Sequence, residues 1–135
     1  MYKRQILRRV VSHGTGRRAR GELYVKIDNE QLQNSKKNNS IKVRIPVFGK
    51  TGTSNNFTTS YFAGFIPYLD QDKDTQKLDP ENSYVVASYV GYDQNYEMRR
   101  GYQKIYGGAG ALPAWTDYAK AVSYTHLTLP TIYSV

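Results

Sequence analysis

The chain has 135 residues, of which 39% are hydrophobic and none is cysteine, and its 19 Lys and Arg against 11 Asp and Glu give a formal net charge of +8. This length predicts one domain with a modest core, and the lack of cysteine excludes disulfides and thiolate metal sites. No uninterrupted apolar stretch is long enough to cross a bilayer, so we expect no membrane contact by this segment.

The first forty residues are predicted to hold the end of a helix and a short strand. Apolar residues in Ile6–Ser12 recur at helical spacing, and Gly14 and Gly16 follow as stop signals. Leu23–Ile27 is the apolar part of an otherwise polar stretch and indicates a short strand. Residues 34–40 have the composition of a loop.

Three strands are predicted in the middle of the chain. Apolar residues alternate through Ile41–Thr53, as in a half-buried strand, and Pro46 indicates a sheet edge because proline cannot donate to a ladder. Tyr61–Ile66 and Tyr84–Gly91 are aromatic and β-branched runs bounded by turn formers. We expect these three segments to pair antiparallel in sequence order.

A second helix is predicted within residues 107–120, where glycines come first and Pro113 lies near the first helical turn. The face expected to pack on the sheet consists of Leu112, Trp115, Tyr118 and Ala119. The fold class is therefore α+β, with antiparallel β-sheet strands and packing helices. Residues 54–60 should form the tight end of the sheet and residues 68–83 the loose one.

The sequence Lys50-Thr51-Gly52-Thr53 ends the first of these strands. Alternation along a strand puts the Thr51 and Thr53 hydroxyls on one face and Lys50 with Gly52 on the other. The two hydroxyls can then hold one carboxylate while the Lys50 ammonium approaches separately. Gly52 removes a side chain where another backbone must come close.

This strand end stands in a longer series of segments with a family resemblance. In chain order they are Val10–Gly16, Ile45–Thr53, Ser54–Asn56, Ser60–Pro67, Val85–Asp93 and Gly107–Trp115. Their order resembles the C-terminal part of the transpeptidase domain of bifunctional, class A penicillin-binding proteins, which belong to the penicillin-binding and β-lactamase-like serine acyltransferases. The resemblance covers residues 6–120 and implies an incomplete C-terminal portion of that domain.

The resemblance implies a peptidoglycan D,D-transpeptidase that cross-links stem peptides by serine acyl transfer, without a metal or another cofactor. Its ligands would be D-Ala-D-Ala stem peptides and β-lactams. It would act at the outer face of the bacterial cytoplasmic membrane, and an N-terminal helix outside this sequence would anchor it.

The resemblance also implies roles for the four residues of the strand end. Thr51, Gly52 and Thr53 would form the substrate-binding strand, in which the two hydroxyls hold the terminal carboxylate. Lys50 and Thr53 would be the catalytic residues. Lys50 would raise the local positive potential and hydrogen-bond to the serine of a separate Ser-x-Asn element. The backbone N–H of Thr53 would be one of two oxyanion-hole donors.

Two other elements of that family's site are missing from the sequence. No serine is followed three residues later by lysine, so the Ser-x-x-Lys nucleophile is absent. Ser54-Asn55-Asn56 matches Ser-x-Asn in form, but it follows Thr53 directly and cannot also face that strand. We therefore expect this chain alone to be inactive.

The two ends of the sequence have an unusual coding relation. Tyr2–Gln5 can be encoded by TATAAGAGACAG, and the codons of residues 121–127 can contain the reverse complement, CTGTCTCTTATA. Both resemble translated ends of a transposon adapter used for sequencing libraries. We expect residues 1–5 and 121–135 to be adapter-derived and residues 6–120 to be the partial transpeptidase domain.

Three alternatives remain open from the sequence. A carboxypeptidase or β-lactamase would share the Lys-Thr-Gly element. The positive charge and 13 tyrosines also fit a small basic protein that binds nucleic acid or an anionic polymer. No nucleic-acid module is recognisable, and we expect no nucleic-acid partner.

The third alternative is a calcium site. The spacing of EF-hand ligands is matched by Asp70, Asp72, Asp74 and Glu81. The glycine that an EF-hand loop requires is replaced by Thr75, which favours an acidic hairpin loop.

Overall fold

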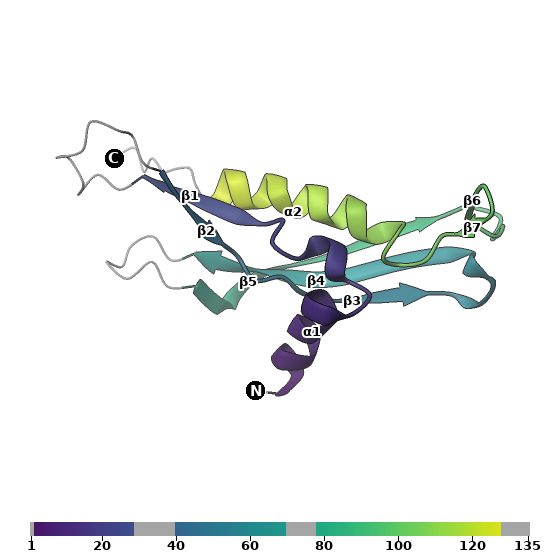
Figure 1. The fold of residues 1–135 in the computed structure, drawn as a ribbon, viewed down its shortest axis with the longest axis horizontal. Helices are drawn as coiled ribbons and strands as arrows, with labels where there is room; N and C mark the ends of the chain where they lie inside the picture. Colours follow the sequence, from purple (N-terminus) through teal and green to yellow (C-terminus); the bar gives the residue numbers. More distant parts are fainter. Residues whose placement is uncertain (1, 29–39, 70–77, 128–135) are drawn as a thin grey trace.

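The computed structural model describes residues 2–28, 40–69 and 78–127. The helices and 3-10 turns are α1 (Tyr2–His13), η1 (Arg17–Ala19), η3 (Asn55–Phe57) and α2 (Ala111–Leu127). The strands are β1 (Tyr24–Asp28), β2 (Ser40–Arg44), β3 (Phe48–Thr53), β4 (Thr59–Leu69), β5 (Leu78–Gly91), β6 (Arg99–Arg100) and β7 (Gln103–Lys104). In Figure 1, α2 lies along the sheet and the shorter α1 lies beside β3. The predicted α+β class is confirmed.

The largest sheet has the strand order β3-β4-β5, with both pairs antiparallel. This confirms the predicted pairing of the strand at Lys50 with Tyr61–Ile66, and of that strand with Tyr84–Gly91. The register places Thr51 opposite Phe62, and Phe62 opposite Ser88. Within the described residues β3 and β5 each pair on one side, so both are edge strands.

The prediction of one continuous strand over Ile41–Thr53 is wrong, because the segment is divided between two sheets. β2 pairs antiparallel with β1 in a separate two-stranded sheet, whereas β3 pairs with β4. The division occurs around Pro46, which has no N–H to donate to a ladder. Ile45 and Val47 on either side are 3% and 4% exposed, so the chain crosses between the sheets through the core.

The connection between β3 and β4 is the tight one, as predicted. The Ser54 N–H donates to the Thr59 carbonyl at 3.0 Å, and the Thr59 N–H donates to the Ser54 hydroxyl at 2.8 Å. Between them, Asn56 and Phe57 have φ angles of 62° and 55°, which are left-handed and allow the chain to reverse within five residues.

At the opposite end of the sheet, the strands β4 and β5 extend into the segment 68–83, which was predicted to be a loose connection. β4 extends to Leu69 and β5 begins at Leu78, with a register shift after Pro67. Of the suggested EF-hand ligands, Asp70, Asp72 and Asp74 lie outside the described residues. Within the described ranges, no three His, Asp or Glu side chains are grouped to hold a metal ion.

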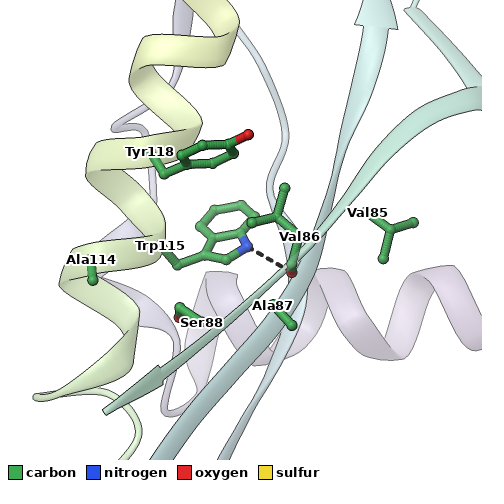
Figure 2. A pocket seen from close by; sticks show the side chains of 7 residues that line it. All are labelled: Val85, Val86, Ala87, Ser88, Ala114, Trp115 and Tyr118. Carbon is green, nitrogen blue, oxygen red and sulfur yellow. Dashed lines mark hydrogen bonds between the residues drawn. The ribbon is translucent and has the colours of Figure 1, made fainter.

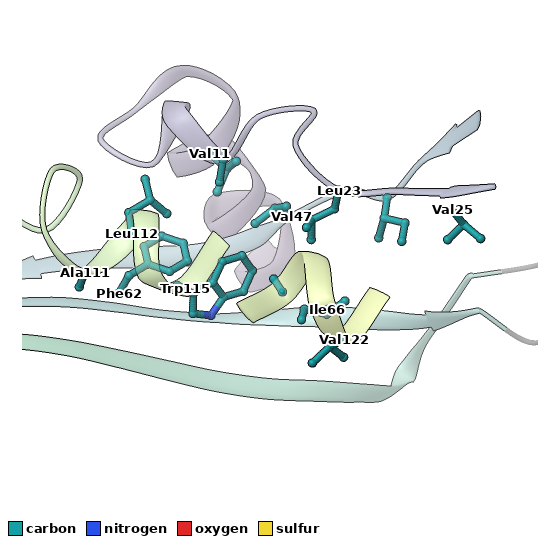
Figure 3. Packing of buried hydrophobic residues seen from close by; sticks show 13 residues of the cluster. Val11, Leu23, Val25, Val47, Phe62, Ile66, Ala111, Leu112, Trp115 and Val122 are labelled. Carbon is teal, nitrogen blue, oxygen red and sulfur yellow. The ribbon is translucent and has the colours of Figure 1, made fainter. Parts of the chain in front are cut away.

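Helix α2 packs on the sheet largely as predicted. Leu112, Trp115 and Ala119 are fully buried, and the Trp115 ring meets the Phe62 ring edge to face at 4.9 Å between centroids. Figure 3 shows this cluster between α2 and the strands. The assignment of Tyr118 to the packing face is wrong, since this residue is 56% exposed.

Helix α1 ends where the glycines predicted it would. The N–H groups of Gly14 and Gly16 both donate to the Val10 carbonyl, at 3.0 and 3.1 Å, and so satisfy the free carbonyl at the helix end. Val11 is the buried residue of α1 and belongs to the same core cluster as Trp115. None of the helices in the described ranges has the length and hydropathy of a membrane span.

Candidate functional site

The segment Lys50–Thr53 forms the end of edge strand β3. In the register, Lys50 lies opposite Ala63 and Thr53 lies opposite Ser60. Because side chains alternate across a strand, Thr51 and Thr53 share the sheet face that carries Phe62 and α2. The structure therefore brings the two hydroxyls to one face, as the alternation predicted.

The register also fixes where the backbone N–H of Thr53 points. The bond from the Ser54 N–H to the Thr59 carbonyl makes this a hydrogen-bonded pair. Hydrogen-bonded and non-hydrogen-bonded pairs alternate along an antiparallel ladder, so Gly52 and Tyr61 form the next hydrogen-bonded pair. Thr53 falls between these two pairs, and its N–H therefore points away from β4, outward from the sheet edge.

The two hydroxyls have different surroundings. Thr53 is exposed, and its hydroxyl oxygen accepts the N–H of Gly107 at 2.9 Å. Thr51 is 7% exposed, and its hydroxyl is hydrogen-bonded to the hydroxyl of Thr15. A hydroxyl has one donor proton and two acceptor lone pairs, so accepting the Gly107 N–H leaves the Thr53 proton available to a ligand.

Lys50 lies on the opposite side of the strand and is exposed. It is placed between two aromatic pairs across β3, β4 and β5. These are Phe48 stacked on Phe65, with ring centroids 4.5 Å apart, and Tyr61 against Tyr89 at 5.2 Å. The Lys50 ammonium donates to the Thr51 carbonyl at 2.7 Å. The ion pairs found among the described residues do not include it. Its positive charge therefore remains available to a ligand anion.

A glycine-rich segment, residues 107–110, closes over the hydroxyl face of β3. A Cβ atom on Gly107 would lie 2.6 Å from the Gly52 carbonyl oxygen, 2.8 Å from that of Tyr61 and 3.0 Å from the Thr51 Cβ. The close approach is made where Gly107 lacks a side chain. A Cβ on Gly52 would meet the Tyr61 side chain at 3.3 Å and no backbone atom, so the backbone approach predicted at Gly52 is not found. A side chain on Gly107 would displace the segment and break its hydrogen bond to Thr53.

Ser54-Asn55-Asn56 continues from β3 into the tight connection. The Ser54 hydroxyl is hydrogen-bonded to the Thr58 hydroxyl and to the Thr59 N–H, at 2.9 and 2.8 Å. These contacts use the serine to close the turn, which confirms that this Ser-x-Asn match does not face Lys50.

Sequence reasoning did not single out Thr15 or Gly107 as members of the site. Both lay within segments of the family resemblance, in Gly14-Thr15-Gly16 and Gly107-Gly108. Paired glycines around a threonine were the available signal, because they indicate close backbone approach. The partners themselves are 36 and 54 residues away in sequence, which periodicity cannot reveal.

A hollow lies at the opposite edge of the sheet, between β5 and α2 (Figure 2). It has a volume of about 460 Å³ and is lined by Val85, Val86, Ala87, Ser88, Ala114, Trp115 and Tyr118. The Trp115 indole N–H donates to the Val86 carbonyl at 3.0 Å, and the Ser88 hydroxyl donates to the Ala111 carbonyl at 2.8 Å. The indole N–H and the serine hydroxyl of this hollow are thus engaged in packing, and its lining does not include Lys50–Thr53.

Comparison with known proteins finds relatives that are named penicillin-binding protein 1A in several bacteria. The chain is 32% identical over 118 residues to penicillin-binding protein 1A of Aquifex aeolicus, covering 87% of the chain and 11% of that protein. It is 34% identical over 77 residues to penicillin-binding protein 1A of Neisseria gonorrhoeae, and 33% over 75 residues to that of Neisseria flavescens. These two matches cover 57% and 56% of the chain, and 7% of each relative.

No protein-family model matches the chain, and no solved structure does. The chain spans about a tenth or less of the length of the relatives it matches. The resemblance predicted from the motifs is confirmed: the chain is related to a segment of the class A penicillin-binding proteins.

Proposed function

We propose that residues 6–120 are part of a peptidoglycan D,D-transpeptidase and supply its Lys-Thr-Gly-Thr strand. The observation that carries this proposal is the placement of three groups at the β3 edge. The N–H of Thr53 points outward, the Thr53 hydroxyl keeps a free proton, and the exposed Lys50 ammonium has no ion-pair partner among the described residues. This set suits an anionic ligand that is extended along the edge.

Each group has a distinct role in the proposed reaction. The Thr53 hydroxyl, with Thr51 behind it, binds the terminal carboxylate of a D-Ala-D-Ala peptide or a β-lactam. The outward Thr53 N–H donates to the oxyanion that forms on the carbonyl under attack, and one such donor contributes roughly 3 kcal/mol of transition-state stabilisation. Lys50 adds positive potential near both negative charges.

The covalent chemistry needs a serine that this sequence does not contain. In the proposed reaction, a serine of a Ser-x-x-Lys element elsewhere in the enzyme loses its proton to a neighbouring base and attacks the D-Ala carbonyl. The peptide C–N bond breaks, and terminal D-Ala leaves after its nitrogen takes up the proton. An amine of a second stem peptide then displaces the serine and restores its proton. The reaction therefore uses a serine nucleophile that lies outside this sequence, and the chain alone is expected to be inactive.

The partners and location follow from the same proposal. The substrates are stem peptides of peptidoglycan, and β-lactams act as their analogues. Such substrates place the enzyme at the outer face of the bacterial cytoplasmic membrane. The excess of basic residues fits contact with an anionic wall.

We further propose that residues 1–5 and 121–135 derive from a sequencing adapter. The proposal rests on the coding relation between the two ends of the sequence. The nucleotide record should show TATAAGAGACAG before the Ile6 codon and its complement after the Lys120 codon, and other codons there would refute the division.

A chimera tests the proposed function. Residues 6–120 would replace the matching segment of the Aquifex aeolicus relative, which we expect to supply the serine. We expect the chimera to be labelled covalently by a fluorescent penicillin and the isolated 135-residue chain to remain unlabelled. A chimera that is folded by circular dichroism but unlabelled would refute the proposal, and labelling of the isolated chain would show another nucleophile.

A further inference from the structure

Three segments meet on the hydroxyl face of β3. They are the turn after α1, which carries Thr15, the strand itself, and the glycine-rich segment 107–110. Their contact is close. A Cβ on Gly108 would lie 2.5 Å from the Thr15 carbonyl oxygen, and a Cβ on Gly107 would lie 3.0 Å from the Thr51 Cβ. Residues far apart in sequence therefore surround both threonines of the strand.

Thr15 bonds directly to the buried threonine. Its hydroxyl and that of Thr51 are hydrogen-bonded, and either oxygen can be the donor. Thr15 itself is exposed, whereas Thr51 is 7% exposed. The Thr15 hydroxyl therefore fixes the side-chain conformation of Thr51, and it contacts Thr51 from the side that faces solvent.

The hydrogen bonds of the two threonines are made to different segments. Gly107 fixes the Thr53 hydroxyl through a backbone N–H, which always donates. Thr15 fixes the Thr51 hydroxyl through a side chain, which can donate or accept. Thr15 can be substituted to test its hydrogen bond to Thr51. Gly107 cannot be substituted in the same way, because a side chain there would clash with its neighbours.

We propose that Thr15 is a positioning residue for Thr51, which lies behind the carboxylate-binding hydroxyl of Thr53. Its hydrogen bond orients the Thr51 side chain. The Thr51 side chain in turn forms part of the surface on which the substrate carboxylate lies. This inference rests on the proposed function of the Lys-Thr-Gly-Thr strand. It assigns a specificity role to the turn after α1, whose residues do not themselves form the strand.

The first test uses the full 135-residue chain and is independent of activity. A double-mutant cycle with Thr15→Val and Thr51→Val should show coupling of about fivefold in the unfolding equilibrium constant, as expected for one neutral hydrogen bond. Thr15→Ser keeps the hydroxyl and should retain the coupling. Thr116→Val is the matched control, because its hydroxyl donates to the Leu112 carbonyl within α2. It should be additive with Thr51→Val, and additivity of Thr15→Val would overturn the proposal.

The second test uses the chimera with two acyl donors, a thioester peptide ending in a carboxylate and its C-terminal amide. Thr15→Val should raise KM for the carboxylate donor about fivefold, with kcat and the amide donor changed less than twofold. Thr15→Ser should restore KM. An equal effect on both donors, or no rescue by serine, would show a merely structural role. Failure of the unsubstituted chimera to react would instead overturn the proposed function, and with it this role.

Discussion

The substitution Gly107→Ala is expected to destabilise the chain far more than Gly52→Ala in β3. The new Cβ would lie 2.6 and 2.8 Å from the carbonyl oxygens of Gly52 and Tyr61, and these backbone atoms are held by the β3–β4 ladder. Overpacking of this kind costs about 1–3 kcal/mol, and a displaced Gly107 N–H would also lose about 1 kcal/mol from its bond to Thr53. Reduced freedom of the unfolded chain returns about 0.4–1 kcal/mol. The expected net loss is about 1–3.5 kcal/mol.

Urea unfolding followed by tryptophan fluorescence measures this loss, because the chain has one tryptophan and Trp115 is fully buried. Gly52→Ala is the matched control. Its Cβ would come no closer than 3.3 Å, to the Tyr61 Cβ, so we expect a loss below about 1 kcal/mol. Equal losses at Gly107 and Gly52 would refute the close approach on which the site geometry depends.

Two further predictions concern the core and the β6–β7 hairpin. Trp115→Ala removes the contact with Phe62 and the bond to the Val86 carbonyl, so it should cost about 3–5 kcal/mol. Because this variant lacks the only tryptophan, its urea unfolding is followed by far-UV circular dichroism, and a loss below about 1 kcal/mol would contradict the packing of α2. The hydrogen bond from Arg99, followed by that from Lys104, lowers the pKa of Glu97 below its ordinary value of 4.5. Its contribution to stability is therefore present above that value and is lost as the pH falls below it, so Glu97→Gln should flatten the acid side of the stability profile. An unchanged profile would contradict the pairing.

Much of the fold followed from local patterns. Tyr61–Ile66 and Tyr84–Gly91 were predictable as strands because β-branched and aromatic residues lie between turn formers, and α2 because its apolar spacing is helical. Tyr118 was misplaced because it lies three residues after Trp115 yet at the border of the buried stripe, where its ring reaches over the hollow beside β5 (Figure 2). Pattern alone places a residue near a helix face but does not show where the face ends.

The division at Pro46 and the partners of the threonines were beyond sequence reasoning for a different reason. Alternation through Ile45 and Val47 is the same whether a strand continues or crosses between sheets. The chain separation between Thr15 and Thr51 likewise leaves no periodic trace. Lys50–Thr53 was recognisable because its chemistry lies in four adjacent residues, whereas its supporting contacts come from tertiary packing.

The central claim is that Lys50 acts as part of an acyl-transfer site. The direct test is the second-order rate constant for acylation of the chimera by a fluorescent penicillin. Lys50→Ala should lower it by about two orders of magnitude through lost electrostatic stabilisation, and the free energy of unfolding should stay within about 0.5 kcal/mol because the side chain is exposed. Lys42→Ala, which removes the same charge from the β1–β2 sheet, should leave the rate constant within twofold. An unchanged rate constant in the Lys50→Ala chimera would mean that this motif is only the end of a strand.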